Sequence, residues 1–214
     1  MRSREESWPT TGSTLVVRDA ECSDIKAMTT VLTTAFAHDD PFGEWLFPDP
    51  HTRARREPKM LAAMIRHRFI PQGSALVATI DERVVGTLLW NASSRKFRPI
   101  HAMLGGIALI GSMGSRVSAG IAMDSTLAAL DPGRPHVVGV YLGCAPDVQR
   151  RGVGRALVNA LTAQCDRDDL PLYLMCKDAN VTYYRDSGFD VVTLSQLGND
   201  GPVVNVMVRP PDHP

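Results

Sequence analysis

The sequence predicts an α/β fold in which helices flank a sheet of about seven strands. Seven short segments rich in β-branched and aromatic residues alternate with segments of helical periodicity. The segment 75–90 indicates an antiparallel hairpin, because two such strands are separated by only three polar residues. The segment 136–157 indicates a strand buried on both faces, a basic loop with two glycines and a helix.

Length and composition indicate one domain over residues 1–214, with flexible tails at 1–12 and 210–214. The chain carries 23 basic and 23 acidic residues, so neither a nucleic acid nor a membrane is expected as a partner. The polar N-terminus lacks the apolar core of a signal peptide. The longest apolar stretch, 100–113, is too short to span a bilayer.

The four cysteines, at positions 22, 144, 165 and 176, show no C-x-x-C spacing. We therefore expect reduced thiols, as in a cytoplasmic protein, and no metal site. A monomer or a homodimer is expected.

The N-terminal part predicts a strand at 15–18 and a helix that is ended by Pro41. Ser23 or Asp24 is placed to cap this helix. Its apolar residues recur at helical spacing and therefore share one face. They are Ile25, Met28, Leu32 and Phe36.

An aromatic, proline-rich segment at 42–50 follows and predicts a loop. Its Phe42, Trp45 and Phe47 indicate either one wall of the acceptor pocket or a small core beneath the loop. A second helix is predicted at 52–68, and its basic residues indicate a solvated face. These are Arg53, Arg55, Arg56 and Lys59.

The region 97–130 predicts two helices or one kinked helix, ended by 131–133. Glycines interrupt it and indicate either a mobile lid over the acceptor or close packing between helices. They are Gly105, Gly106, Gly111 and Gly114. The remaining elements are predicted as strands at 75–80, 84–90, 137–144, 170–176, 190–194 and 203–209, a helix that runs to about 167, and a short helix within 178–189.

The loop after the central strand is Gln149-Arg150-Arg151-Gly152-Val153-Gly154, and a helix follows it directly. Successive backbone N–H groups and the positive end of the helix dipole suit such a loop to phosphate binding. A P-loop is excluded, because Arg155 and Ala156 stand where Lys and Ser or Thr are required. A dinucleotide fingerprint would need Gly or Ala at Leu157 and a repeated βαβ unit. An ordinary basic strand-to-helix turn is the remaining alternative.

This loop matches the Gln/Arg-x-x-Gly-x-Gly/Ala motif of the GNAT superfamily of N-acetyltransferases. The segment 180–189 resembles the second signature of that family, Asn-x-x-x-Tyr-x-x-x-Gly-Phe. The chain therefore resembles this superfamily over residues 14–209. It also resembles, more loosely, puromycin N-acetyltransferase and its relatives, through Ala-Phe-Ala at 35–37, the long middle helical region and the final Met207-x-Arg209.

The resemblance implies a mixed, mainly antiparallel sheet whose fourth and fifth strands run parallel and splay apart to admit acetyl-CoA as co-substrate. The stretch Leu142-Gly143-Cys144 would offer backbone groups to the pantetheine arm and the acetyl carbonyl. Asn180 would bond to the pantetheine, and the loop would hold the pyrophosphate. The loop residues implied are Gln149, Arg150, Arg151, Gly152, Val153, Gly154, Arg155 and Ala156.

The resemblance also implies direct attack of an amine on the thioester in a ternary complex. Tyr184 would lie beside the sulfur and protonate the departing thiolate. The family often has Glu-Thr where Met175 and Cys176 stand, so a carboxylate base is missing there, and Cys176 is expected to be an inert buried thiol. The general base is left open among Asp39, Asp40, Glu44, His136 and water.

The function that follows is transfer of an acetyl group from acetyl-CoA to the amine of a small molecule, such as an antibiotic or another secondary metabolite. An amine of a protein or peptide is the enzymatic alternative. A non-catalytic acyl-CoA-binding module is the alternative from another class. The missing carboxylate favours that module, whereas the retained Tyr184 argues against it.

Overall fold

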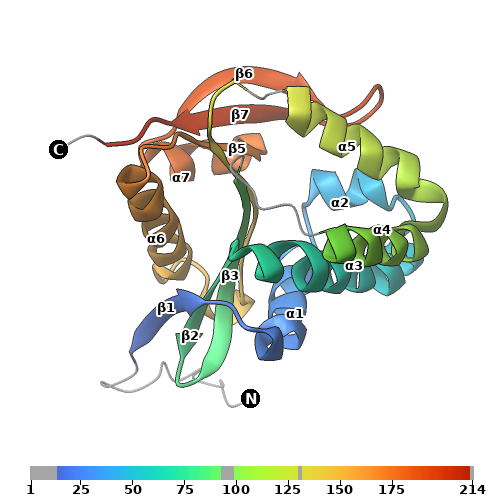
Figure 1. The fold of residues 1–214 in the computed structure, drawn as a ribbon, viewed down its shortest axis with the longest axis horizontal. Helices are drawn as coiled ribbons and strands as arrows, with labels where there is room; N and C mark the ends of the chain where they lie inside the picture. The colour runs from blue at the N-terminus through green and yellow to red at the C-terminus, as the bar shows by residue number, and fades with distance from the viewer. Residues whose placement is uncertain (1–13, 93–98, 130–131, 213–214) are drawn as a thin grey trace, which may run out of the picture.

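The computed structural model describes residues 14–92, 99–129 and 132–212, and it contains one seven-stranded sheet. The strands lie in the order β1-β2-β3-β4-β5-β7-β6 (Figure 1). Neighbouring strands are antiparallel except for β4 and β5, which are parallel. The predicted mixed, mainly antiparallel sheet is therefore confirmed. The strands are β1 (Leu15–Asp19), β2 (Ala75–Ile80), β3 (Arg83–Ala92), β4 (Val137–Cys144), β5 (Leu172–Cys176), β6 (Asp190–Gln196) and β7 (Val203–Arg209).

The fourth and fifth strands splay apart, as predicted. They are paired from Val137 and Leu172 to Gly139 and Leu174, whereas β4 continues to Cys144. On its other side β4 pairs with β3, with a shift of register that leaves Val140 as a bulge. The bulge bends β4 just where its pairing with β5 ends, which opens a space between the two strands.

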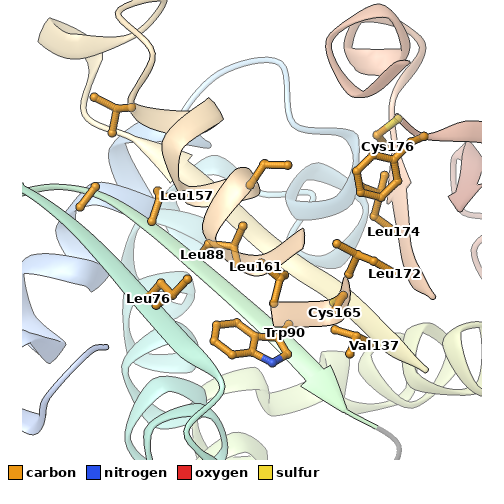
Figure 2. Close-up of a cluster of buried hydrophobic side chains, with 14 of the residues drawn as sticks. Leu76, Leu88, Trp90, Val137, Leu157, Leu161, Cys165, Leu172, Leu174 and Cys176 are labelled. Carbon is orange, nitrogen blue, oxygen red and sulfur yellow. The ribbon is translucent and has the colours of Figure 1, made fainter. Parts of the chain in front are cut away.

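Helices cover both faces of the sheet, with α6 on one face and α1 and α3 on the other (Figure 1). Side chains alternate accordingly along β3, since Leu88 and Trp90 belong to the core beneath α6 and Leu89 to the core beneath α1. Figure 2 shows the first of these cores. The helices are α1 (Ile25–Ala35), α2 (Pro41–Leu46), α3 (Pro50–Met64, continued by a π-helical turn at Ile65–Phe69), α4 (Pro99–Met113), α5 (Val117–Ala129), α6 (Val153–Arg167) and α7 (Val181–Arg185).

The prediction that Pro41 ends the first helix was wrong, because Pro41 begins α2. Proline suits the first position of a helix, where its missing N–H would have no partner. The carboxylate of Asp40 caps α2 by accepting hydrogen bonds from the N–H groups of Phe42 and Gly43. Much of the predicted loop at 42–50 is therefore helical. Asp24 occupies the N-cap position of α1, but its carboxylate accepts hydrogen bonds from Arg18 and Glu21 instead.

The solvated face predicted for the basic run of α3 does not include Arg53, which is only 9% exposed. Its guanidinium donates to the carboxylates of Glu57 (3.1 Å) and Asp40 (3.3 Å) and to the carbonyl of Phe36 (2.5 Å). Arg53 thus ties together the end of α1, the start of α2 and the first half of α3. The sequence pattern could not reveal this, because all three partners come from tertiary or medium-range packing.

The region 97–130 forms two helices, α4 and α5, as predicted. They are separated at Gly114, whose φ of +58° lies in the left-handed region that favours glycine. A side chain at Gly114 would collide with the guanidinium of Arg56, which donates to the carbonyl of Ser112 at 3.0 Å. Close packing between helices therefore accounts for this glycine. Within the described part of the chain, none of the helices has the length and apolar character needed to cross a membrane.

Candidate active site

The loop between β4 and α6 adopts a backbone that presents N–H groups at a helix N-terminus. Arg150 (φ +61°) and Gly152 (φ +85°) are both left-handed, and Gly152 is the N-cap of α6. The N–H of Ala156 donates to the carbonyl of Gly152 at 2.9 Å, which is the first turn of the helix. Helix geometry therefore leaves the N–H groups of residues 153–155 without an intrahelical acceptor, next to the positive end of the dipole. This arrangement fits an anionic phosphate group.

A cavity of about 840 Å³ adjoins this loop. It extends along the part of β4 that has left β5, and to the start of α7. Ten of the site residues predicted from the sequence line it: Leu142, Gly143, Cys144, Gln149, Arg150, Gly152, Gly154, Arg155, Asn180 and Tyr184.

Three predicted residues are placed differently. Val153 is 2% exposed and packs into the core beneath α6, so only its backbone faces the loop. The N–H of Ala156 is used within the helix, so it is not a free donor for the pyrophosphate, as had been predicted. Arg151 is exposed and is not among the residues that line the cavity. The motif marks the loop correctly, but which groups face the cavity depends on where the helix begins.

Tyr184 lies on α7, with its ring in edge-to-face contact with Tyr183 (5.1 Å between centroids) and Phe189 (5.7 Å). Burial, followed by the neighbouring Tyr183, Cys176 and Cys144, raises the pKa of its phenol. The phenol is therefore neutral at physiological pH and retains the proton that a general acid must donate. Tyr183 also lines the cavity, and its hydroxyl oxygen is buried without a hydrogen-bond partner.

The raised pKa of Tyr184 predicts a particular pH dependence. Since only the protonated phenol can donate, and its pKa lies above the ordinary value of about 10, kcat should show no descending limb caused by Tyr184 below about pH 10. A pH profile of kcat at saturating substrates measures this. A descending limb near pH 8 that disappears in Tyr184→Phe would contradict it.

Two thiols lie at the cavity, and both are poor nucleophiles. Burial raises the pKa of Cys144 to about 11 and that of Cys176, with a smaller contribution from Asp178, also to about 11. Both are therefore thiols rather than thiolates near neutral pH. This agrees with the expectation that Cys176 is inert.

The other end of the cavity carries carboxylates. Asp40 is 9% and Glu57 is 7% exposed, and both line the cavity while sharing the guanidinium of Arg53. Burial raises the pKa of both carboxyl groups, although Arg53 opposes the rise. Asp39 also lines the cavity and forms an ion pair with Lys177 at 2.5 Å.

These positions narrow the predicted set of general bases. Glu44 has a side chain that is 61% exposed, and it is not among the lining residues. His136 is buried against Tyr173, with its Nδ1 2.9 Å from the carbonyl of Arg134, and it is not a lining residue either. Sequence reasoning missed Glu57, because a single glutamate in a basic helix carries no signal of its own. Asp39, Asp40 and Glu57 are the carboxylates on the cavity wall.

The three aromatic residues predicted as a pocket wall have three different surroundings. Phe42 lines the cavity, and Phe47 is buried in the core at 1% exposure. Trp45 donates from Nε1 to the carboxylate of Asp200 at 3.1 Å and packs against Gly201 in the β6–β7 connection. From the region 97–130, Met123 of α5 is the described side chain that lines the cavity, so the predicted contribution of 100–114 is not observed among described side chains.

These positions predict different outcomes for two alanine variants. Phe42→Ala removes apolar surface from the cavity wall and should raise the acceptor KM about tenfold, with little change in affinity for acetyl-CoA. Trp45→Ala, its matched control, should lower the free energy of unfolding by about 2 kcal/mol and leave the acceptor KM nearly unchanged. Steady-state kinetics and thermal melts measure the two effects. An acceptor KM that responds to Trp45→Ala and not to Phe42→Ala would contradict the assignment.

Comparison with known proteins identifies the family to which this site belongs. The profile of the acetyltransferase (GNAT) family matches residues 36–189, which include the loop, β4, β5 and Tyr184. No curated protein sequence gives a significant match.

Solved structures share the fold at low sequence identity. A protein described as histone acetyltransferase HPA2 and related acetyltransferase, from Corynebacterium glutamicum, is 23% identical with a TM-score of 0.71, over 94% of this chain and 98% of its own. A polyamine N-acetyltransferase from Drosophila melanogaster is 15% identical with a TM-score of 0.63, over 92% and 100%. A ribosomal-protein alanine N-acetyltransferase from Escherichia coli is 15% identical with a TM-score of 0.54, over 94% and 96%. The loop, the splayed strands and the family match agree, and the chain therefore belongs to the GNAT family of acetyltransferases.

Proposed function

We propose that this enzyme transfers an acetyl group from acetyl-CoA to the amine of a small molecule, by direct attack in a ternary complex. One observation carries the proposal: a single cavity is lined by the phosphate-binding loop and Tyr184 as well as by the carboxylates of Asp39, Asp40 and Glu57. A donor held by the loop and an amine held by the carboxylates would share this cavity. Enzymes of the GNAT family use an acyl-CoA, typically acetyl-CoA, which supplies the activated acyl group.

The residues at the loop fit the donor. The N–H groups of residues 153–155 would bind the pyrophosphate, and Arg150 and Arg155 would add positive charge beside it. Backbone groups of Leu142, Gly143 and Cys144 would pair with the pantetheine arm, because this part of β4 no longer pairs with β5. Asn180 lines the cavity at the start of α7 and would bond to the same arm.

The reaction requires an amine without its extra proton and a thiolate that gains one. The amine nitrogen attacks the thioester carbonyl carbon, the new C–N bond forms, and the C–S bond breaks. Tyr184 would give its phenolic proton to the departing sulfur. The proton lost by the amine would pass to water or to a wall carboxylate, and Asp40 and Glu57 are the two whose raised pKa suits them to accept it.

The wall chemistry supports a small, positively charged acceptor. Arg53 neutralises only one of the two buried carboxylates Asp40 and Glu57, so this part of the wall retains negative charge and would attract an ammonium group. The printed acceptors of the related structures differ, a polyamine in one and a ribosomal protein in another, so likeness of fold does not choose between them. An antibiotic or another secondary metabolite with a basic amine, as for the puromycin N-acetyltransferases, is the subclass we propose.

The experiment is thiol release from acetyl-CoA in the presence of a panel of small amines, peptides and aminoglycosides, with acetyl-CoA alone as the background control. We expect turnover with at least one small cationic amine, and loss of that turnover in Tyr184→Phe. Turnover with peptides alone would overturn the small-molecule acceptor. Tight binding of acetyl-CoA without turnover on any acceptor would support the non-catalytic binding module instead.

A further inference from the structure

A second, smaller cavity lies between the splayed strands, at the point where their pairing ends. Its volume is about 40 Å³, and it is enclosed by β3, β4, α6, β5 and α7. Its inner wall is formed by Leu88, Leu161, Leu172, Leu174 and Phe189, which belong to the core beneath α6. Figure 2 shows Leu88, Leu161, Leu172 and Leu174 around this part of the core. We call this cavity the apolar recess.

The recess adjoins the large cavity, because Gly139, Val140, Tyr141, Leu142, Met175 and Tyr184 line both. The phenol of Tyr184 and the backbone of the bulge at Val140 are its polar boundary, whereas its depth is lined by apolar side chains. An apolar space of this kind favours a hydrocarbon group over water.

We propose that the recess accepts the acyl chain of the donor and that the enzyme uses propionyl-CoA as well as acetyl-CoA. The proposal rests on the proposed function, since the thioester sulfur must lie beside Tyr184 and the acyl carbons follow directly after the sulfur. The recess is slightly larger than the roughly 30 Å³ that one water molecule occupies in the liquid, and a methylene group is of similar size. It therefore has room for one added carbon and not for a long chain.

The chemistry is unchanged by the longer chain. The amine attacks the carbonyl carbon of the propionyl thioester, an N-propionyl amide forms, and coenzyme A leaves as a thiolate that takes the proton from Tyr184. Burial of one methylene group is worth about a fourfold gain in affinity, which offsets the poorer fit of a larger donor. We therefore expect kcat/KM for propionyl-CoA within about threefold of the acetyl-CoA value, and a fall of at least about 100-fold for hexanoyl-CoA, whose chain would have to displace the core.

The glycine at the mouth of the recess offers a sharp test. A Cβ at Gly139 would lie 3.7 Å from both Cβ of Leu174 and the carbonyl oxygen of Tyr173, which is ordinary contact, so Gly139→Ala fits without displacing either strand. Its methyl group would occupy space at the recess. The ratio of kcat/KM for propionyl-CoA to that for acetyl-CoA should fall by at least about tenfold. Leu174→Val, which removes a methylene from the inner wall, should raise the ratio of butyryl-CoA to acetyl-CoA instead.

The outcomes separate this inference from the proposed function. Transfer from acetyl-CoA with propionyl-CoA more than about 100-fold poorer would overturn the inference and leave the acetyltransferase intact. A propionyl-to-acetyl ratio that is unaffected in folded Gly139→Ala, with folding checked by its melting temperature, would also overturn it. Failure of every acyl-CoA to support transfer to any acceptor would instead overturn the proposed function.

Discussion

Replacing Tyr184 by phenylalanine is expected to lower kcat by about 10²–10⁴-fold while affinity for acetyl-CoA and stability change little. The substitution keeps the ring that packs against Tyr183 and Phe189 and removes the one acidic proton that the proposed role requires. The expected loss corresponds to about 3–5 kcal/mol of transition-state stabilisation. Because the proton is needed only as the thiolate leaves, the loss should appear in kcat rather than in donor binding.

Two further Tyr→Phe variants interpret this result. Tyr173→Phe on β5 lies outside the cavity lining and should keep kcat within about twofold, which makes it the matched control. Tyr183 lines the cavity and could donate in place of Tyr184, so Tyr183→Phe combined with Tyr184→Phe tests for substitution. Full kcat in the double variant would show that the thiolate leaves unassisted or takes its proton from water. The role of Tyr184 would then be wrong, whereas membership of the family would stand.

The second large effect is expected at the loop, where Gly154→Val should raise the dissociation constant of acetyl-CoA by at least about 100-fold. A Cβ at Gly154 would lie 2.9 Å from the hydroxyl of Tyr183 and 3.5 Å from the sulfur of Cys144, in a part of the cavity wall where the backbone has to approach the donor. Two lost charge-assisted hydrogen bonds to pyrophosphate, at about 1.5–3 kcal/mol each, account for the magnitude. The fold should tolerate the change, since the closest atom is the end of the Tyr183 side chain, which is able to shift.

Gly152→Val reaches the same result by another cause. A Cβ there meets no atom within 4 Å, but the φ of +85° is a strained conformation for a β-branched residue, so the loop should leave its binding geometry. Gly111→Val in α4 is the matched control, because its Cβ would also meet open space at an ordinary φ. Calorimetry with acetyl-CoA measures all three variants. Unchanged affinity in folded Gly154→Val would refute the assignment of the loop.

Much of the fold could be predicted from local patterns. The hairpin of β2 and β3, the buried strand β4 and the helix α6 each follow from periodicity within a dozen or so residues. The ends of elements were less predictable, because a proline both ends one helix and suits the first turn of another. At Pro41 the carboxylate of Asp40 decided which, by accepting hydrogen bonds from the first N–H groups of α2.

By itself, the sequence determined the order of the strands and helices, the position of the phosphate-binding loop and the tyrosine on α7. These depend on short-range properties, namely hydrophobic spacing, the φ angles open to glycine and the donors at a helix start. Only the tertiary structure decided which groups share the cavity. It buried Arg53 between Asp40 and Glu57, brought Glu57 to the wall and left His136 away from it. Burial and charge pairing are set by contacts between segments far apart in the chain, and these contacts, not the residue types, fix the environment of each titratable group.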